Sequence, residues 1–423
     1  MMIRVKLADL VPGMVTASDV FTTEGRFLLP AGSVLTERSI RLLKAWGLVE
    51  AVVDHDGPLP GGHDGRDADP RILAEAREIN KKRFMHTNPY HPAIIELERL
   101  SAVRRAGYTA EGVDSAAPFD DGAKRLQFPK NLSAELQPIN LGRLREFGLR
   151  LPTLPAVFDR VNEIIMNPKS SAGDIAQVVS KDSGLTSRLL GIVNSAFYGF
   201  VSKVDTVSRA VAIVGTKQLM SLVFGISIVK IFERIPADHI DMRQFWRHSV
   251  ACGITSRIIA GYKQIQNTER LFVAGLLHDI GRLLLYHLWP EHALYVLNLS
   301  RRDSRLLYEV EREVLGMDHA IIGARMAEQW KFPFLLESNI LYHHSPGASH
   351  NLLEASIINL ADVLVNAMEM GSSGEVFVPP LDEAAWNALN ISENLLTVIV
   401  DHTDRQLDEV MDYFFPESAE GET

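Results

Sequence analysis

The sequence has little cysteine and no excess of positive charge, and both shortages restrict what the protein can be. Cys252 is the only cysteine in 423 residues, so we expect no disulfide framework and no Cys-based zinc site. Its surroundings, SVACGIT, predict a small core residue. The formal net charge of −10 argues against broad electrostatic binding to nucleic acid or to an anionic membrane.

Long apolar runs and phosphate-binding loops are also missing. The first residues, MMIRVKLADLVPGM, lack an apolar h-region and carry Asp9, so no secretory signal is expected. The apolar stretch 204–232 is interrupted by Arg209, Lys217 and Gln218, which argues against a membrane span. No Gly-rich phosphate loop or nucleophile elbow occurs. The composition, 46% hydrophobic and 23% charged, is that of a globular protein, and we expect it in the cytoplasm.

The first part of the chain predicts a small α/β module, residues 1–56. Short β-like runs at 2–5, 26–29 and 50–53 alternate with turn signals, and the helical pattern TERSIRLLKAWG lies between them. We expect this module to serve structure or interaction.

Residues 57–139 are expected to form a linker with helical segments. Its start, GPLPGGHDGRDADP, is too polar and too rich in Gly and Pro to bury a core. A helix is predicted over residues 71–106, broken near Asn88-Pro89 and His91-Pro92. His86 and His91 lie near these breaks, where packing at helix ends is the favoured role.

From residue 140 onward the pattern is persistently helical. We expect a main domain at 140–370, divided into 140–235 and 236–370, followed by C-terminal helices and an acidic tail at 371–423. A helix–turn–helix interpretation of residues 174–194 fails because the basic and acidic side chains there cancel, whereas a recognition helix needs donors to phosphates and bases. We therefore expect no nucleic-acid partner.

Residues 271–283, LFVAGLLHDIGRL, combine an apolar helical pattern with two adjacent polar residues, His278 and Asp279. Burying an imidazole and a carboxylate is costly unless their polar atoms find partners. A metal ion would satisfy both, since it accepts a neutral nitrogen and a charged oxygen as ligands. The alternative is a surface pair at the end of a core helix.

Three segments resemble one family: LPTLP, DSGLTSRLLGIVNSAFYG and AVAIVGTKQL, in that order. They closely resemble the HDOD family of bacterial output domains, relatives of the HD phosphohydrolases, over about residues 140–370. The resemblance implies a mainly α fold, an HD-superfamily-like helical bundle. LADLVPGM, GRFLLPAGSVLT and IRLLKAWG, in turn, resemble the small domain that often precedes HD-GYP domains.

The resemblance also implies a ligand set in the order H…HD…D, and each member is expected on a helix. A larger group of candidate metal ligands comprises His248, His278, Asp279 and Asp362, with His319, His343 and His344 at the positions of a second metal. Such a site suits Mn, Fe, Ni, Zn or Mg, and the sequence does not choose among them. Each residue alone also has an ordinary interpretation: a hydrogen-bonded core histidine, a carboxylate at a helix cap, or a helix C-terminus.

The resemblance implies a regulator, since HDOD domains are generally non-catalytic. His343-His344 is followed by SPGASH, which lacks the pattern of HD-GYP enzymes. Arg282 replaces the usual lysine of the motif. It keeps a positive charge that could bind phosphate, but it cannot donate a proton near neutral pH. We expect a signalling protein with a protein partner or a small nucleotide-like ligand. The alternative is a metal-dependent phosphohydrolase of nucleotide phosphoesters. Arg301 and Arg305, in RRDSR, are expected in a solvated turn.

Overall fold

The computed structural model describes residues 70–110, 172–200, 202–232 and 240–415, together with 160, 163–164 and parts of the first 54 residues. It separates into two compact units. One contains Met1–Ala74 and Arg105–Val113, and the other contains Glu75–Arg104 and Asp114–Thr423. LPTLP and the start of the linker lie outside the described residues. The domain boundaries expected above stay predictions.

The first unit contains two small antiparallel sheets. One has the strand order β1 (Met2–Lys6), β5 (Glu50–Asp54), β2 (Val15–Thr16), and the other pairs β3 (Val20–Phe21) with β4 (Phe27–Leu29). In β5, Ala51 and Val53 lie two residues apart and therefore point to the same face. Both are buried, in a small core with Leu35 and Leu43. Three of these strands, β1, β4 and β5, lie where the β-like runs predict them.

The linker helices are α2 (Pro70–Arg83) and α3 (Pro92–Ala110). The helix ends before Asn88-Pro89 and begins again at Pro92, close to the predicted breaks. Proline suits the first position of a helix because its missing N–H needs no partner there. The Nδ1 of His91 accepts a hydrogen bond from the backbone N–H of Ala93, at 3.2 Å. His91 therefore acts at a helix end, as the sequence predicts.

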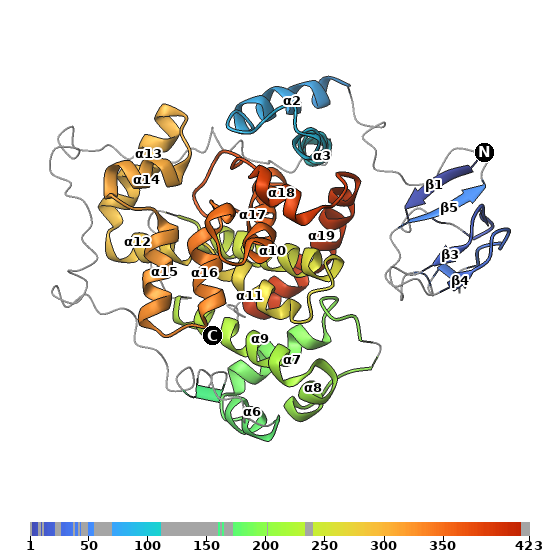
Figure 1. Cartoon of the computed structure of the whole chain (residues 1–423), viewed down its shortest axis with the longest axis horizontal. Helices are drawn as coiled ribbons and strands as arrows, with labels where there is room; N and C mark the ends of the chain where they lie inside the picture. Colours follow the sequence, from blue (N-terminus) through green and yellow to red (C-terminus); the bar gives the residue numbers. More distant parts are fainter. Residues whose placement is uncertain are drawn as a thin grey trace, which may run out of the picture. The chain divides into compact units, whose positions relative to one another are not determined.

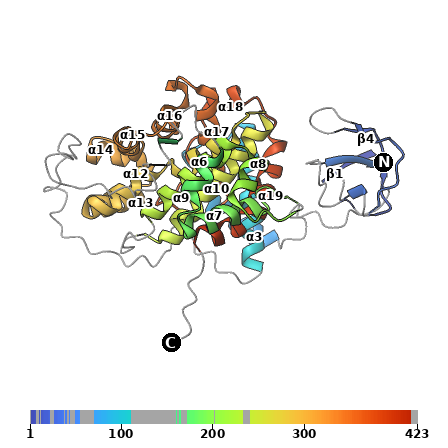
Figure 2. The same ribbon diagram turned by 90° about the horizontal axis from the view of Figure 1, so that it is seen from below.

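The second unit is a helical bundle in two parts (Figures 1 and 2). The first part is α6 (Ala172–Val179), α7 (Ser183–Asn194), α8 (Val207–Val214) and α9 (Thr216–Phe232). Asp182 caps α7 by accepting from the N–H of Leu185, and Thr206 caps α8 by accepting from Arg209. These caps satisfy backbone donors that have no partner within the helix.

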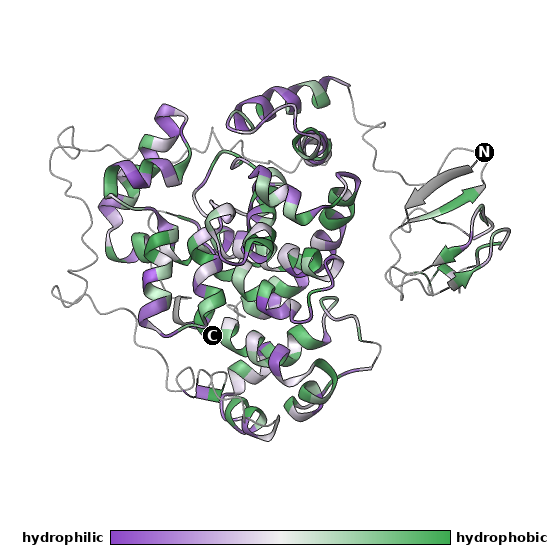
Figure 3. Ribbon diagram, in the orientation of Figure 1, coloured by the Kyte–Doolittle hydropathy of each residue, from purple (hydrophilic) through white to green (hydrophobic). Residues whose placement is uncertain are grey.

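The second part supplies the candidate site. Its helices are α10 (Met242–Tyr262), α11 (Thr268–Leu277), α12 (Ile280–Leu288), α13 (Pro290–Asp303), α14 (Leu307–Leu315), α15 (His319–Gln329), α16 (Phe334–Tyr342), the 3-10 turn η3 (Pro346–Ala348) and α17 (Leu352–Ala367). The C-terminal helices α18 (Glu383–Leu389) and α19 (Asn394–Phe414) follow. One continuous apolar core runs from the α2–α3 pair through α19. Figure 3 shows the polar residues concentrated on peripheral helices such as α2. The expected mainly α fold is confirmed.

The HD segment departs from the expected single helix. The chain forms two helices, α11 and α12, and His278 and Asp279 occupy the turn between them. In an unbroken helix, adjacent side chains point about 100° apart, so the break lets both side chains reach one cluster. By length and composition the segment Thr268–Leu288 would suit a membrane span, but 89% of its most apolar window is buried in the bundle. It is a core segment.

Two glycines let neighbouring helices approach this turn closely. A Cβ on Gly275 would lie 2.5 Å from the carbonyl oxygen of Cys252 in α10. A Cβ on Gly281 would overlap the carbonyl of His319 in α15. Neither position tolerates a larger residue without moving a backbone. The two glycines therefore set α10 and α15 directly against the two ends of the HD turn.

Candidate metal centre

The first group of candidate ligands comes from three places in the chain. His248 projects from α10, His278 from the HD turn and Asp362 from α17. The Nε2 atoms of the two histidines are 3.4 Å apart. The Oδ1 atom of Asp362 lies 3.3 Å from Nε2 of His248 and 3.5 Å from Nε2 of His278. None of these residues is more than 4% exposed.

The second group consists of three histidines at the ends of two helices. His319 begins α15, His343 ends α16 and His344 follows it. The Nε2 of His319 lies 3.2 Å from Nε2 of His343 and 3.0 Å from Nε2 of His344. The structure therefore brings together all seven residues that the sequence singles out as ligands.

Asp279 lies between the two groups and presents one oxygen to each. Its Oδ2 lies 3.3 Å from Nε2 of His278 and 3.6 Å from Nε2 of His248. Its Oδ1 lies 3.0 Å from Nε2 of His319 but makes no hydrogen bond of acceptable geometry. A buried oxygen without a partner is costly, and a cation on either side would satisfy it. Asp279 could therefore hold one metal ion on each side, together with the histidines of each group.

The ring orientations of three histidines also favour metal binding. The Nδ1–H groups of His278 and His343 donate to the carbonyls of Gly275 and Ile340, each at 2.7 Å. The Nδ1 of His319 lies 2.6 Å from the carboxylate of Glu311. Such bonds fix the tautomer and leave Nε2 as the ligand atom. Neutral rings held this way turn their Nε2 lone pairs toward one another, an arrangement that a shared cation stabilises.

Without a cation, protons would compensate the buried carboxylates. Burial lowers the pKa of His278, but Asp279 and Asp362 outweigh it and raise that pKa to about 10. Burial opposes ionisation of Asp279 as well, yet Arg282, His278 and His319 together hold its pKa well below the usual range. Burial and the charges of His278 and His319 lower the pKa of His343 to about 3. The metal-free cluster thus holds anionic aspartates beside both protonated and neutral rings.

Arg282 holds Asp279 through Oδ2, the same oxygen that faces His248 and His278. Its Nη1 donates to Oδ2 of Asp279 at 2.9 Å and to Oγ of Ser373. Its Nε lies 3.6 Å from Oε1 of Glu311, and the residue is 3% exposed. These contacts give Arg282 a role in positioning the carboxylate of Asp279. Its binding of phosphate stays a prediction.

Sequence reasoning missed three residues around the cluster. Cys252 lies in the first group, with Sγ 3.6 Å from Nε2 of His248, and its spacing of four residues from His248 on one helix was the available signal. Glu311 holds His319 from α14, and Tyr308 stacks on His344 with ring centroids 4.3 Å apart. The contacts of Glu311 and Tyr308 cross between helices, and no local pattern marks them.

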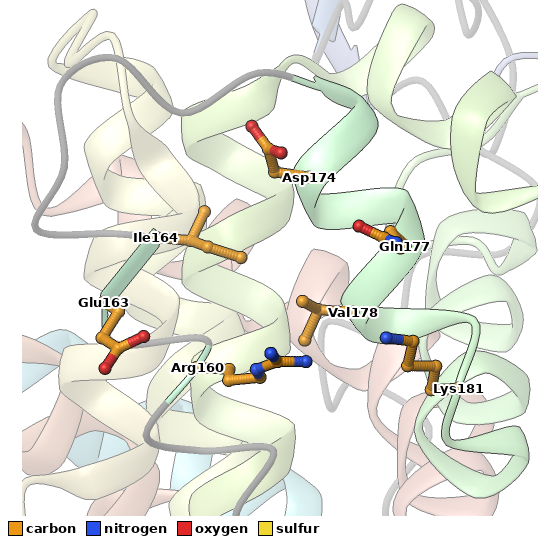
Figure 4. Close-up of a pocket in the computed structure, with 7 residues that line it drawn as sticks. All are labelled: Arg160, Glu163, Ile164, Asp174, Gln177, Val178 and Lys181. Carbon is orange, nitrogen blue, oxygen red and sulfur yellow. The ribbon is translucent and has the colours of Figure 1, made fainter.

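The other polar candidates lie outside the cluster. His86 contacts the carbonyl of Ser304 at 2.9 Å, and Arg305 pairs with Glu313 at 2.7 Å. A separate pocket is lined by residues of α6 and by nearby residues that include Arg160 and Glu163 (Figure 4). Its charged side chains are of both signs, and none belongs to the histidine–aspartate cluster. The described residues thus concentrate the candidate metal ligands in one buried place.

Comparisons with known proteins agree with the mainly α fold. Residues 151–346 match the family profile of the HDOD domain, so this part of the chain is an HDOD domain. A curated, uncharacterised protein of Treponema pallidum is 23% identical over 231 residues, which is 53% of this chain. The matched region spans only 44% of that protein's length.

Three solved structures share the fold. An HDOD domain protein of unknown function from Geobacter sulfurreducens is 22% identical, with a TM-score of 0.56, covering 65% of this chain and 98% of that one. A protein from Shewanella amazonensis, provisionally named a phosphohydrolase, is 23% identical, with a TM-score of 0.52 and coverages of 65% and 97%. A protein from Marinobacter aquaeolei, provisionally named a signal transduction protein, is 22% identical, with a TM-score of 0.53 and coverages of 67% and 63%.

Proposed function

We propose that this protein is a cytoplasmic bacterial regulator whose HDOD domain holds divalent metal ions in its core and signals through contacts with other molecules. The proposal rests on one observation: the ligands of the cluster are shielded from solvent. His248, His278, Asp279, His319 and His343 are each at most 1% exposed. A phosphoester substrate cannot touch ions held among side chains so completely buried, whereas an ion there can still set the packing of the surrounding helices.

The residues present suit such ions. Imidazole nitrogens and carboxylate oxygens are ligands for Mn, Fe, Ni, Zn or Mg. When bound in related enzymes with an open coordination position, a metal lowers the pKa of water and neutralises phosphoryl oxygens. Here the chain's own part is to hold the ligands: Gly275, Ile340 and Glu311 orient the rings, and Arg282 holds Asp279.

The alternative function is a metal-dependent phosphohydrolase. It is favoured by the two-sided placement of Asp279, which matches the bridging carboxylate of a two-metal hydrolytic site. A similar solved structure also carries the provisional name of phosphohydrolase. Catalysis would require an opening beside the half-buried His344, where Tyr308 now stacks on the imidazole.

We also propose a role for the remaining parts of the chain. The N-terminal module, with its resemblance to the domain that precedes HD-GYP domains, would recognise a signalling protein. A small nucleotide-like ligand is the second candidate partner. The solved structure named provisionally as a signal transduction protein is consistent with such a setting.

The test compares stability with turnover in the full chain. The protein is loaded with Mn²⁺, Zn²⁺ or Fe²⁺ and assayed against nucleotides, cyclic dinucleotides and p-nitrophenyl phosphate, while its melting temperature is recorded. We expect metal to raise the melting temperature and to produce no hydrolysis above the metal-free level. Metal-dependent hydrolysis that Asp279→Asn abolishes would reject the regulator in favour of the phosphohydrolase.

A further inference from the structure

Cys252 lies inside the first group of ligands, although nothing in the H…HD…D order includes it. It follows His248 by one helical turn on α10, so both side chains leave the same face of that helix. Its Sγ, the Nε2 atoms of His248 and His278, and a carboxylate oxygen of Asp362 all lie within 4.8 Å of one another. Cys252 is fully buried, and no other cysteine exists in the chain.

The separations within this group fit the angles of a tetrahedron, and Oδ2 of Asp279 lies beside it as a fifth donor, 3.3 Å from Nε2 of His278 and 3.6 Å from Nε2 of His248. Zinc-to-nitrogen bonds of about 2.0–2.1 Å and zinc-to-sulfur bonds of about 2.3 Å would place two nitrogens about 3.4 Å apart and nitrogen and sulfur about 3.6 Å apart at the tetrahedral angle. The Nε2 atoms of His248 and His278 are 3.4 Å apart. The Sγ of Cys252 lies 3.6 Å from Nε2 of His248. An octahedral centre would need shorter separations, of about 3 Å for bonds of about 2.1 Å.

The backbone around Cys252 is held in place by the neighbouring helix. The glycine contact described above presses α11 against the carbonyl of Cys252, and Gly253 makes a matching contact, since a Cβ there would lie 2.7 Å from the carbonyl oxygen of Phe272. Two such contacts on successive residues fix the position of the thiol relative to the HD turn. The other oxygen of the HD carboxylate also faces this group, since Oδ2 of Asp279 lies 3.3 Å from Nε2 of His278 and 3.6 Å from Nε2 of His248.

We propose that Cys252 is a ligand of the first metal ion, which makes this centre a thiolate site selective for Zn²⁺, Co²⁺ or Fe²⁺ over Mg²⁺ and Mn²⁺. Thiolate is a soft ligand that favours the former ions, whereas an oxygen-rich set favours the latter. On binding, the thiol loses its proton to solvent and forms one metal–sulfur bond, with no change in oxidation state. This inference rests on the proposed metal centre and names the chemistry of its first ion.

Cobalt provides the direct test, because a thiolate bound to Co²⁺ gives an intense near-ultraviolet charge-transfer band. The full chain is stripped with chelator, loaded with Co²⁺ and followed by absorption spectroscopy and elemental analysis. We expect the band to grow with the first equivalent and to be absent from Cys252→Ser and Cys252→Ala. As a matched control, His319→Gln should keep the band, because it alters only the second group. Since the chain has a single cysteine, the band has no other intramolecular source.

The outcomes separate this inference from the metal centre itself. Bound Co²⁺ with visible ligand-field bands but no charge-transfer band would overturn the role of Cys252 and leave the centre standing. No bound Co²⁺ in a folded protein, judged by circular dichroism, would overturn both. In a competition between Zn²⁺ and Mn²⁺, the ratio of the affinity for Zn²⁺ to that for Mn²⁺ should be roughly tenfold or more lower in Cys252→Ser than in wild type. An unchanged preference would likewise argue against a thiolate ligand.

Discussion

The two parts of the helical unit bury different kinds of side chain. Among its described residues, the α6–α9 part buries almost only apolar groups, such as Leu189 and Phe224, and keeps its ionisable residues at caps or on the surface. The part from α10 to α17 buries histidines, aspartates, glutamates and an arginine. Both parts form close-packed helices. Helix packing here therefore does not require buried charge, and the charges in the second part need another explanation.

Energetics makes the contrast sharper. Removing an ion from water costs several kcal/mol even after relaxation, so several buried ionisable groups would oppose folding unless they compensate one another. The contacts of Asp279 with Arg282 and His278 provide some compensation. The Oδ1 of Asp279 and the facing Nε2 atoms still lack partners other than one another. Bound metal ions would give these buried oxygen and nitrogen atoms the partners that the protein does not supply.

The largest expected effect comes from metal removal. Each bound ion stabilises the native state by about 2.7 kcal/mol when its concentration is 100 times its Kd, so loss of two ions at that level would cost about 5 kcal/mol. We expect chelation to lower the melting temperature and to increase hydrogen exchange in α10–α12 and α15–α17 more than in α6–α9. Equal increases in both parts would remove the distinction between them.

A core substitution in the α6–α9 part should lower the stability of the protein and leave its metal content unchanged. Leu189 in α7 is fully buried, and Leu189→Ala should cost about 2–5 kcal/mol through lost burial and a cavity. Denaturant unfolding measures the cost, and elemental analysis should find the metal content of the folded variant unchanged. If the fully folded variant bound less metal, then packing in the α6–α9 part would affect metal binding in the α10–α17 part, and the two parts would not be independent.

The smallest expected effect concerns the cap of α7. Asp182 accepts the N–H of Leu185 and pairs with Lys230 at 2.9 Å, and the cap bond and the lysine lower its pKa despite partial burial. Asp182→Ala should cost about 1 kcal/mol at neutral pH, mostly from the cap, because the partly exposed ion pair is screened.

The pH dependence of this cap follows from the sign of the shift. A carboxyl whose pKa is lower in the folded state stabilises above the unfolded value of 3.8 and loses that contribution as pH falls through the folded pKa. The difference between wild type and Asp182→Ala should therefore shrink in acid, as followed by urea unfolding. A difference that grows in acid would show that the charge of Asp182 is unfavourable in the native state.

The sequence predicted the helical class and the members of the cluster through different kinds of information. Helical periodicity and caps such as Thr206 identify elements locally. The gathering of His248, the HD pair and Asp362 is a long-range fact, and only the family resemblance suggested it. The break at His278 was missed because apolar residues continue across it from α11 into α12. This turn is held by the close helix contacts of Gly275 and Gly281 and by the bond from His278 to the carbonyl of Gly275. The spacing of apolar residues along the sequence contains no sign of these contacts.

Cys252 and Glu311 show two different limits of such reasoning. Cys252 has a helical neighbour, His248, at the right spacing, but its apolar surroundings favour a core residue, and it is indeed in the core. Glu311 lies on α14 and meets His319 at the start of α15, so its role depends on how two helices fold together. The place of Cys252 beside His248 could have been predicted from their spacing, whereas the role of Glu311 could be seen only in the tertiary structure.

The central claim is the proposal that the buried cluster would hold two metal ions, one on each side of Asp279. Metal content of the chelated and reconstituted protein tests it most directly, measured by elemental analysis for wild type, His319→Gln and Asp279→Asn. The account predicts about two equivalents per chain in wild type and about one in His319→Gln. Asp279→Asn should fall furthest, since it removes the charge shared by both ions. Near-zero metal in folded wild-type protein, with none gained on reconstitution, would contradict the claim.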